Sequence, residues 1–319
     1  MAICVAKFGG SSLADKEKLF IAASEIQKEY LSGNSVVVVV SARGGTTDKL
    51  IRDAADIFGG DNLPAEELDK VLATGELLSA AMMALALNKL GIPSTSLSGA
   101  RAGITTDSSF GSAKVLEVKT DTLKHYLDKG FVVVVAGFQG ADKDGCVTTL
   151  GRGGSDNSAV ILASALKAQK CLIYTDVDGV YTADPRKVIN AKKYNSLSYK
   201  DMLEYSRLGA KVLSRGSVEL AIKGNVPLTV LKPLSSSGGT VIGTKNFPKF
   251  SDIVGITASK GTVSVIGKCI DNDIRAVTES LESNRIAMKN VNISEASATF
   301  GIIPGYEDQA VELIHNIFF

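Results

Sequence analysis

The sequence predicts an α/β protein whose first part is an open, mainly parallel sheet sandwiched by helices, followed by a small α+β domain. Short β-branched runs alternate with helical stretches, and these runs are apolar almost without interruption, as in strands covered on both faces. The pattern changes after Gly243. At about 150 residues per domain, the chain length favours two domains.

The apolar runs place the strands of the sheet. We expect strands near residues 2–8, 35–40, 92–97, 131–136, 170–175 and 226–231. Residues 15–31 and 121–130 have helical spacing, and Pro64 opens a long helical region that Gly91 closes. In such sheets, ligands bind where the carboxyl ends of the strands meet the loops. Binding residues are therefore sought in those loops.

The residues after Gly243 predict a separate domain. Residues 244–251 carry Lys, Asn, Pro and Asp and are interpreted as a linker, which gives domains at 1–245 and 251–319. For the second domain we expect strand 262–268, helix 272–284, strands near 286–293 and 296–303, and helix 306–317. This β-α-β-β-α order is ferredoxin-like, but it leaves no room for a last strand.

Composition and charge narrow the possible functions. The formal net charge of +1 gives no overall attraction to nucleic acid or to an anionic membrane. No apolar run approaches the roughly 18 residues of a membrane span, and the N-terminus has no signal-peptide pattern. The cysteines have no paired spacing and are expected to be reduced, buried thiols; they are Cys4, Cys146, Cys171 and Cys269. We therefore expect a cytoplasmic protein without nucleic-acid or membrane partners.

Three glycine-rich segments follow predicted strands. In residues 7–12 (KFGGSS), glycines without Cβ let backbone N–H groups close on a phosphate, and Lys7 adds a full charge. The segment is not a P-loop. The second segment is 41–48 (SARGGTTD), and the third is 151–156 (GRGGSD), whose arginine can bind a carboxylate through two hydrogen bonds. Turns and helix caps remain the alternatives.

Three weaker signals lie elsewhere. Residues 175–186 (TDVDGVYTADPR) place two carboxylates after a strand, then an aromatic residue and an arginine, which suits a nucleotide or a simple turn. Residues 209–213 (GAKVL) are expected to be helical, with a lysine that is solvated or bound to a ligand. Gly75 interrupts a strong helix at a cost of up to about 1 kcal/mol, so close approach of a ligand is expected. Neither His125 nor His315 is expected to be catalytic.

Taken together and in order, these segments resemble the aspartokinases, a branch of the amino-acid kinase superfamily. The resemblance is carried by KFGGSSL (7–13), TGE (74–76), GRGGSD (151–156) and DVDGVYTADPR (176–186). It covers essentially the whole chain, and the tail resembles an ACT domain. It implies the amino-acid kinase fold and transfer of the γ-phosphoryl group of ATP to the β-carboxylate of L-aspartate, in lysine, threonine and methionine biosynthesis. Mg²⁺ should accompany ATP, with ligands that the sequence does not assign.

The resemblance also implies residue roles. Lys7 and Asp156 would be catalytic, with Lys7 neutralising the charge that develops on the phosphoryl group. Aspartate would be held by Ser41, Thr47, Glu76, Arg152 and Ser155. ATP would be held by Lys7, Gly9, Gly10, Ser11, Thr175, Asp176, Tyr181, Asp184, Arg186 and Lys211. A carboxylate acceptor is ionised at pH 7, so no general base is required.

The sequence departs from the family pattern in three places. Ser214-Arg215 follows the Lys-Val-Leu segment where the family has His-Pro, and residues 231–233 (LKP) replace an asparagine-containing strand end. Residues 251–319 leave room for one ACT-like domain where the family commonly carries two. The loop at 269–273 also lacks the Pro-Gly pair that often borders an effector, so weak or absent inhibition by lysine or threonine is expected.

Other readings stay open. A glutamate or N-acetylglutamate kinase would share the fold and the phosphate loops, although Glu76 is a poor neighbour for an acylated nitrogen. A non-catalytic amino-acid-sensing protein would keep the fold without turnover, but the retained Lys7, Arg152 and Asp156 argue against it. The small tail is at the margin of independent stability, and its open sheet edge favours a partner. We expect a symmetric homodimer through the ACT-like domain.

Overall fold

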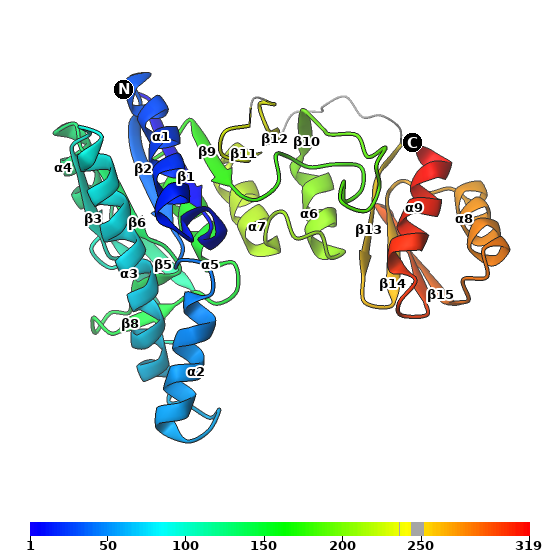
Figure 1. Cartoon of the computed structure of the whole chain (residues 1–319), viewed down its shortest axis with the longest axis horizontal. Helices are drawn as coiled ribbons and strands as arrows, with labels where there is room; N and C mark the ends of the chain where they lie inside the picture. The colour runs from blue at the N-terminus through cyan, green and yellow to red at the C-terminus, as the bar shows by residue number, and fades with distance from the viewer. Residues whose placement is uncertain (236, 244–251) are drawn as a thin grey trace. The chain divides into compact units, whose positions relative to one another are not determined.

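The computed structural model describes residues 1–235, 237–243 and 252–319 (Figure 1). The described chain forms two compact units, Met1–Asp178 with Glu219–Gly238, and Gly179–Val218 with Gly239–Phe319. The predicted linker, 244–251, lies outside the described residues, and the predicted domain limits at 1–245 and 251–319 stay a prediction.

A parallel sheet forms the centre of the first unit. Its strands lie in the order β11-β9-β1-β2-β6-β3, and each neighbouring pair is parallel. The strands are β1 (Ile3–Phe8), β2 (Ser35–Val40), β3 (Ser94–Leu97), β6 (Val132–Ala136), β9 (Lys170–Tyr174) and β11 (Leu228–Leu231). The mainly parallel sheet predicted from the apolar runs is confirmed.

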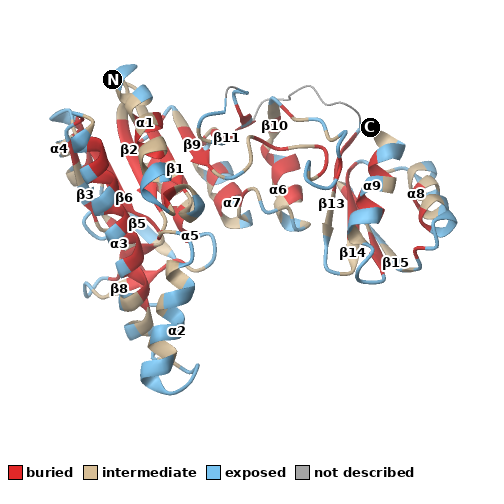
Figure 2. Cartoon of the chain, in the orientation of Figure 1, coloured by how far each residue is buried: buried red, intermediate tan, exposed pale blue. Residues whose placement is uncertain are grey.

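Helices cover both faces of this sheet (Figure 1). Helices α1 (Lys16–Leu31) and α3 (Ala65–Lys89) pack on one face, and α5 (Gly154–Ala165) contacts β1, β2 and β9 from the other. Residues 36–40 of β2 and 132–136 of β6 are buried at every position, as the red ribbons in Figure 2 show. Burial on both faces explains why these runs are apolar without alternation.

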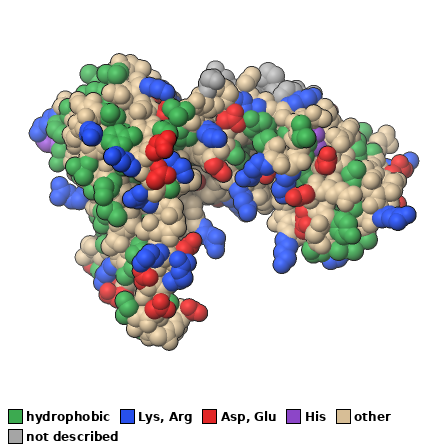
Figure 3. Space-filling view, in the orientation of Figure 1, with side chains coloured by type: hydrophobic (Ala, Val, Ile, Leu, Met, Phe, Trp, Pro, Cys, Tyr) green, Lys and Arg blue, Asp and Glu red, His purple; other side chains and the backbone are tan. Residues whose placement is uncertain are grey.

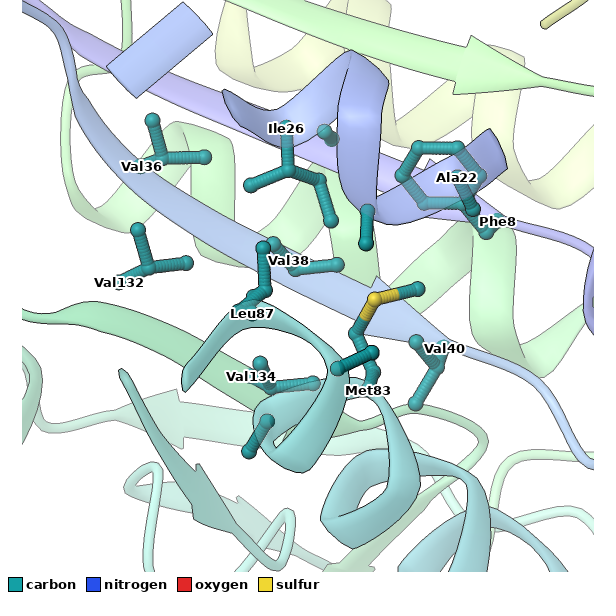
Figure 4. Close-up of a cluster of buried hydrophobic side chains, with 14 of the residues drawn as sticks. Phe8, Ala22, Ile26, Val36, Val38, Val40, Met83, Leu87, Val132 and Val134 are labelled. Carbon is teal, nitrogen blue, oxygen red and sulfur yellow. The ribbon is translucent and has the colours of Figure 1, made fainter. Parts of the chain in front are cut away.

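The main core cluster lies between the sheet and the helices α1 and α3. Figure 4 shows Ile26 from α1 and Met83 and Leu87 from α3 over the strand residues Val38 and Val134. These five side chains are almost wholly buried. Alternate strand residues point to this face, so the packing fixes the strands from which the first two glycine-rich segments leave.

Helix α3 is long and apolar enough, by length and composition, to cross a membrane, and it is the one such helix among the described residues. Its most apolar window has a mean hydropathy of 1.5, which the search for uninterrupted apolar runs overlooked. However, 56% of that window is buried inside the structure. Asp69 and Glu76 on the same helix are buried as well, so α3 is placed as a core helix.

Two short helices and a second sheet complete the first unit. The helices are α2 (Thr46–Phe58) and α4 (Asp121–Asp128); on the face shown in Figure 3, acidic and basic side chains are interspersed over α2. The second sheet has the order β5-β4-β7-β8, with β4 (Ile104–Thr106), β5 (Val115–Val118), β7 (Gln139–Ala141) and β8 (Val147–Thr149). The sequence did not predict this sheet, because strands of three or four residues are too short to show a period.

The second unit ends in an antiparallel sheet covered by two helices. The sheet order is β13-β14-β16-β15, and the elements are β13 (Ile253–Ser259), β14 (Thr262–Gly267), α8 (Asp271–Ser283), β15 (Met288–Ile293), β16 (Ser297–Ile302) and α9 (Glu307–Phe318). The predicted β-α-β-β-α order is confirmed, but β13 was missed. The strand for which there was no room after α9 comes from before β14.

The structure corrects two predictions outside the elements described so far. The other described elements are β10 (Ser196–Ser198), α6 (Tyr199–Arg207), α7 (Arg215–Gly224) and β12 (Thr240–Gly243), with β10 and β12 parallel. The helix predicted at 209–213 is wrong, because these residues lie between α6 and α7 and Gly209 has a φ of 102°, a conformation that ends helices. The four cysteines are free as predicted, but Cys146 and Cys269 are only half-buried.

Candidate active site

Lys7 and Asp156, the residues predicted to be catalytic, lie next to each other. Lys7 is one residue before the end of β1, and Asp156 is in the first turn of α5. The distance from Lys7 Nζ to Asp156 Oδ1 is 2.6 Å, and the side chains are only 12% and 15% exposed. This ion pair holds the ammonium group in place, and a lysine ammonium group has three N–H donors, so donors remain for a ligand.

The turn after β1 packs against the loop after β2. The residues that follow Gly9 form η1 (Gly10–Leu13), a 3₁₀ turn that precedes α1. Gly44 N donates to Gly10 O at 3.0 Å, and a Cβ on Gly10 would lie 2.5 Å from Ala42 O. Position 10 therefore requires glycine because of the neighbouring loop. A Cβ on Gly9 would lie 3.5 Å from Lys7 Nζ, so Gly9 keeps the space beside the ammonium group open.

Arg43 joins the same two loops through its side chain. Its Nε donates to Leu13 O at 3.0 Å, and its Nη2 donates to Ala14 O at 2.7 Å. The sequence interpretation of residues 41–48 gave no role to this arginine. An arginine between an alanine and two glycines was the available signal, but its partners are backbone carbonyls that no sequence pattern marks.

Glu76 is a buried carboxylate beside the second loop. It is 4% exposed, and its Oε1 accepts a hydrogen bond from Ala42 N at 3.0 Å. Burial raises the pKa of Glu76 to about 7, although the hydrogen bond from Ala42 N acts in the opposite direction. A carboxylate held in this way is well suited to a cationic ligand group, because a cation would relieve the cost of burying its charge.

Gly75 does not have the predicted role. A Cβ there would lie 2.9 Å from Ala42 Cβ and 3.4 Å from Thr46 Cγ2. The close approach that requires glycine is therefore made by the second loop and the start of α2, and not by a ligand. The same contact sets the position of Ala42, whose N–H group binds Glu76.

The third glycine-rich segment leads into α5, which begins at Gly154. Gly151 and Gly153 have φ values of 70° and 73°, in the left-handed region that favours glycine. Arg152 between them is exposed, whereas Ser155 is 9% exposed. The arginine is therefore free to meet an incoming carboxylate.

The remaining residues predicted to bind aspartate lie in or next to the second loop. Ser41 directly follows β2, and its N–H group donates to Phe8 O at 3.1 Å. Thr47 is the second residue of α2. Both are half-buried. The structure therefore places Ser41, Thr47 and Glu76 around one loop.

Asp69 is a buried carboxylate that the sequence analysis missed. It is 1% exposed and accepts hydrogen bonds from Gly111 N, from Thr149 N at 2.7 Å and from Thr149 Oγ1 at 2.6 Å. Asp69 lies seven residues before Glu76, on the same face of α3. Its donors satisfy it, so Asp69 fixes the second sheet and leaves Glu76 as the carboxylate available to a ligand on this helix.

The residues predicted to bind the nucleotide divide between the two units. In the first, Thr175 and Asp176 follow β9, whose last residue Tyr174 lies opposite Phe8 in register. The Tyr174 and Phe8 rings stack at 4.4 Å. Thr175 and Gly9 therefore leave neighbouring strands at the same edge of the sheet.

In the second unit, Asp184 and Arg186 bind each other. Arg186 donates to both carboxylate oxygens of Asp184, at 3.0 and 2.8 Å, and these bonds hold the pKa of Asp184 below its usual value. Tyr181 accepts a hydrogen bond from Tyr205 Oη on its carbonyl oxygen at 3.0 Å. Lys211 is exposed in the loop after α6.

The sequence matches a known protein family. The model of the amino acid kinase family matches residues 2–232. Among curated proteins, the chain is 47% identical over 242 residues to an aspartokinase of Bacillus sp. (strain MGA3), which covers 76% of this chain but only 58% of that protein. It is 39% identical over 328 residues to aspartokinase 2 of Bacillus subtilis (strain 168), which covers 97% of this chain and 80% of that protein.

A solved structure shares the fold. The crystal structure of E. coli aspartokinase III in complex with aspartate and ADP matches with a TM-score of 0.72 at 24% identity, over 96% of this chain and 80% of that chain. At this identity the likeness concerns the fold. It agrees with the helix-flanked parallel sheet that the apolar runs predicted.

Proposed function

The chain belongs to the amino acid kinase family and, within it, to the aspartokinases, and on that premise we propose that it transfers the γ-phosphoryl group of ATP to the β-carboxylate of L-aspartate. The product is 4-phospho-L-aspartate, which serves lysine, threonine and methionine biosynthesis. The observation that carries the proposal is the Lys7–Asp156 ion pair at the glycine turn after β1. A fixed cation beside backbone N–H groups suits a phosphoryl group in transfer.

In this proposal the loop after β1 binds the phosphoryl group and the loop after β2 contributes to the aspartate site. Lys7, Gly9, Gly10 and Ser11 hold the transferring phosphoryl group, and Asp156 keeps the Lys7 ammonium group in position. The lysine ammonium group carries three N–H donors, so Lys7 can pair with Asp156 and still donate to phosphate oxygens. The acceptor carboxylate is already ionised at pH 7, so the chain needs no general base.

Aspartate binds on the other side of the second loop. Glu76 takes the α-ammonium group, whose positive charge offsets the cost of keeping this buried carboxylate ionised. The exposed Arg152 takes a carboxylate through its planar guanidinium group. Ser41, Thr47 and Ser155 complete the set as hydroxyl partners.

The proposed nucleotide residues are carried over from the family resemblance. Thr175 and Asp176 follow β9 at the sheet edge that carries Gly9, which supports a role next to the phosphates. Tyr181, Asp184, Arg186 and Lys211 supply the rest of the proposed set. Nucleotide use agrees with the ADP and aspartate bound to E. coli aspartokinase III.

Mg²⁺ accompanies ATP in this proposal. Mg²⁺ commonly keeps water and phosphate oxygens as most of its ligands, so it would arrive on the nucleotide. When bound, it neutralises charge on the phosphates.

One assay separates this function from the alternatives. Purified protein with ATP and Mg²⁺ is offered aspartate, glutamate or N-acetylglutamate, with hydroxylamine to trap the acyl phosphate and a coupled reaction to report ADP. We expect aspartyl hydroxamate and matching ADP release. Turnover of another acceptor in place of aspartate would overturn the substrate assignment, and absence of turnover with all three would favour a non-catalytic amino-acid-sensing protein.

The second unit supports a proposed homodimer through its ACT-like sheet. The outer edge of β13 is bound within the unit, since Ile256 N donates to Thr182 O at 2.7 Å and Tyr194 Oη donates to Val254 O at 2.7 Å. The other edge strand, β15, is mostly exposed, and exposed edges favour pairing. Light scattering tests this, and a monomer at micromolar concentration would contradict it. We also propose that the protein is cytoplasmic.

A further inference from the structure

Arg43 has no role in the proposed reaction, yet it connects the two loops that have one. It lies in the loop after β2, which carries the proposed aspartate residues. Its guanidinium group donates to Leu13 O and Ala14 O, at 3.0 and 2.7 Å. These carbonyls lie at the end of η1, the turn that begins with Gly10. One side chain thus ties the end of the proposed phosphate turn to the neighbouring loop.

Backbone contacts make the same connection at the other end of the turn. Gly44 N donates to Gly10 O at 3.0 Å, and Ala42 O lies against the Cα of Gly10, where a Cβ would be only 2.5 Å away. Ala42 N in turn donates to Glu76. The turn is therefore held at its start by backbone and at its end by Arg43, and the same loop holds the proposed aspartate-binding carboxylate.

The two hydrogen bonds from Arg43 satisfy carbonyls in largely apolar surroundings. Arg43 lines a pocket of about 340 Å³ whose walls are mostly apolar, although Lys16, Ser79 and Lys89 line it as well. Leu13 is buried, and a buried carbonyl left without its donor costs about 1–3 kcal/mol. The turn would therefore shift toward another partner if the guanidinium group were removed.

We propose that Arg43 is a positioning residue that locks the turn Gly10–Leu13 and thereby places the N–H groups of the phosphate loop. The inference rests on the proposed function. Two hydrogen bonds from a rigid, planar cation fix orientation as well as distance. Phosphoryl transfer depends mainly on positioning, so a small displacement of the turn lowers the rate although Arg43 touches neither substrate.

The test compares Arg43→Met with Arg52→Met. Methionine keeps an unbranched stem in the pocket but removes both donors, whereas Arg52 is exposed on α2 and serves as the matched control. We expect Arg43→Met to lower kcat by about 10- to 100-fold and to leave the KM for aspartate largely unchanged. Without substrates, amide hydrogen exchange should accelerate in a peptide covering residues 9–15 and not in β2. Arg52→Met should match the wild type in every measurement.

Other outcomes separate the inference from the proposed function. An inactive wild type contradicts the proposed function, while the exchange experiment still tests whether Arg43 locks the turn. An active wild type with unchanged kcat and unchanged exchange in Arg43→Met would overturn the inference. If Arg43→Met does not fold, Arg43→Lys, which keeps one cationic donor, decides: a folded variant with reduced kcat and faster exchange at residues 9–15 supports the positioning role. A loss of kcat no larger than the fraction of unfolded protein contradicts it.

Discussion

The two units bury polar side chains in different ways. In the second unit, buried polar side chains pair with one another: Thr182 Oγ1 meets His315 Nε2 at 2.9 Å, and Ser264 Oγ meets Thr299 Oγ1 at 2.8 Å, although His315 Nδ1 has no hydrogen-bond partner among the described residues. In the first unit, Lys7 and Glu76 keep capacity that their neighbours do not use. Buried polar groups that are paired with each other stabilise a fold, whereas groups held in place with capacity left over are prepared for a ligand.

The sheet edge of the first unit is packed so tightly around these groups that two positions require glycine. Glycines at positions 10 and 75 allow the loop around Ala42 to approach so closely that a Cβ at either position would collide with it. Substitutions at this sheet edge should therefore change kinetics, whereas substitutions in the buried polar pairs of the second unit, away from the proposed nucleotide residues, should change stability alone.

The largest expected effect is a loss of kcat on substitution of Lys7, with the surface Lys49–Asp53 pair as the comparison. Lys7→Met should lower kcat by on the order of 10³-fold, because the ammonium group contacts the phosphoryl group most strongly as charge develops. Lys49 pairs with Asp53 on the surface of α2, and Lys49→Met should leave kcat unchanged. Steady-state kinetics with aspartyl hydroxamate as the readout measures both. An equal loss of kcat in both variants would contradict a special role for the Lys7–Asp156 ion pair.

The next effect concerns aspartate binding and its pH dependence. Glu76→Gln should raise the KM for aspartate by on the order of 10- to 100-fold with a smaller change in kcat, since it removes the charge that meets the α-ammonium group. Because the pKa of Glu76 is about 7, kcat/KM for aspartate in the wild type should fall as the pH drops below 7. The variant should lack this titration. A Glu76→Gln variant that weakens ATP and leaves aspartate unchanged would contradict the assignment.

The same substitution should act on stability in the opposite direction. The pKa of Glu76 is raised from 4.5 to about 7 in the folded state, so the wild type loses stability as the pH rises from 4.5 through 7. At pH 8 the neutral amide of the Glu76→Gln variant avoids this cost, which amounts to at most about 3 kcal/mol. Urea unfolding at pH 5 and pH 8 measures it. A variant less stable than the wild type at pH 8 would mean that Glu76 is a structural carboxylate like Asp69.

Much of this arrangement could be predicted from the sequence, and the reason for the exceptions is physical. The strands β1, β2, β6 and β9 were predicted because burial on both faces leaves unbroken apolar runs. Lys7 stood out because it precedes two glycines where a strand ends, whereas the role of Asp156 was implied by the family resemblance. The three-residue strands have no such local pattern to reveal them, whereas β13, with the apolar start Ile253-Val254, was overlooked although it has one.

Residues whose partners are distant in the sequence could not be assigned. Arg43 and Asp69 bind backbone groups of other loops, and a backbone group carries no side-chain signal. Gly75 was correctly identified as a position of close approach, but the sequence cannot distinguish a ligand from Ala42. The roles of the nucleotide residues, from Thr175 to Lys211, stay predictions.

A smaller effect distinguishes packing from propensity at Gly75. Alanine in the middle of a helix ordinarily gains up to about 1 kcal/mol over glycine. Here the added Cβ would lie 2.9 Å from Ala42 Cβ, so Gly75→Ala should instead destabilise by about 1–3 kcal/mol. Thr74→Ala, on the exposed face of the same helix, should change stability by no more than about 0.5 kcal/mol. Thermal unfolding measures both, and a stabilised Gly75→Ala would show that the second loop can move away.

The smallest effect tests the second unit. His315 is 1% exposed, its Nδ1 is buried without a hydrogen-bond partner among the described residues, and burial together with the nearby Lys192 lowers its pKa from 6.5. A lowered histidine pKa means that stability is present above pH 6.5 and is lost as the pH falls below it, because only the unfolded chain then takes up the proton readily. His315→Gln keeps a donor for Thr182 and removes the titration, so its urea midpoint should fall less between pH 8 and pH 5.5. His125→Gln on the exposed face of α4 should behave like the wild type. An unchanged pH slope in His315→Gln would show that other groups destabilise this unit in acid. A large loss of kcat at pH 8 would break the separation between side chains prepared for a ligand and side chains that are only packed.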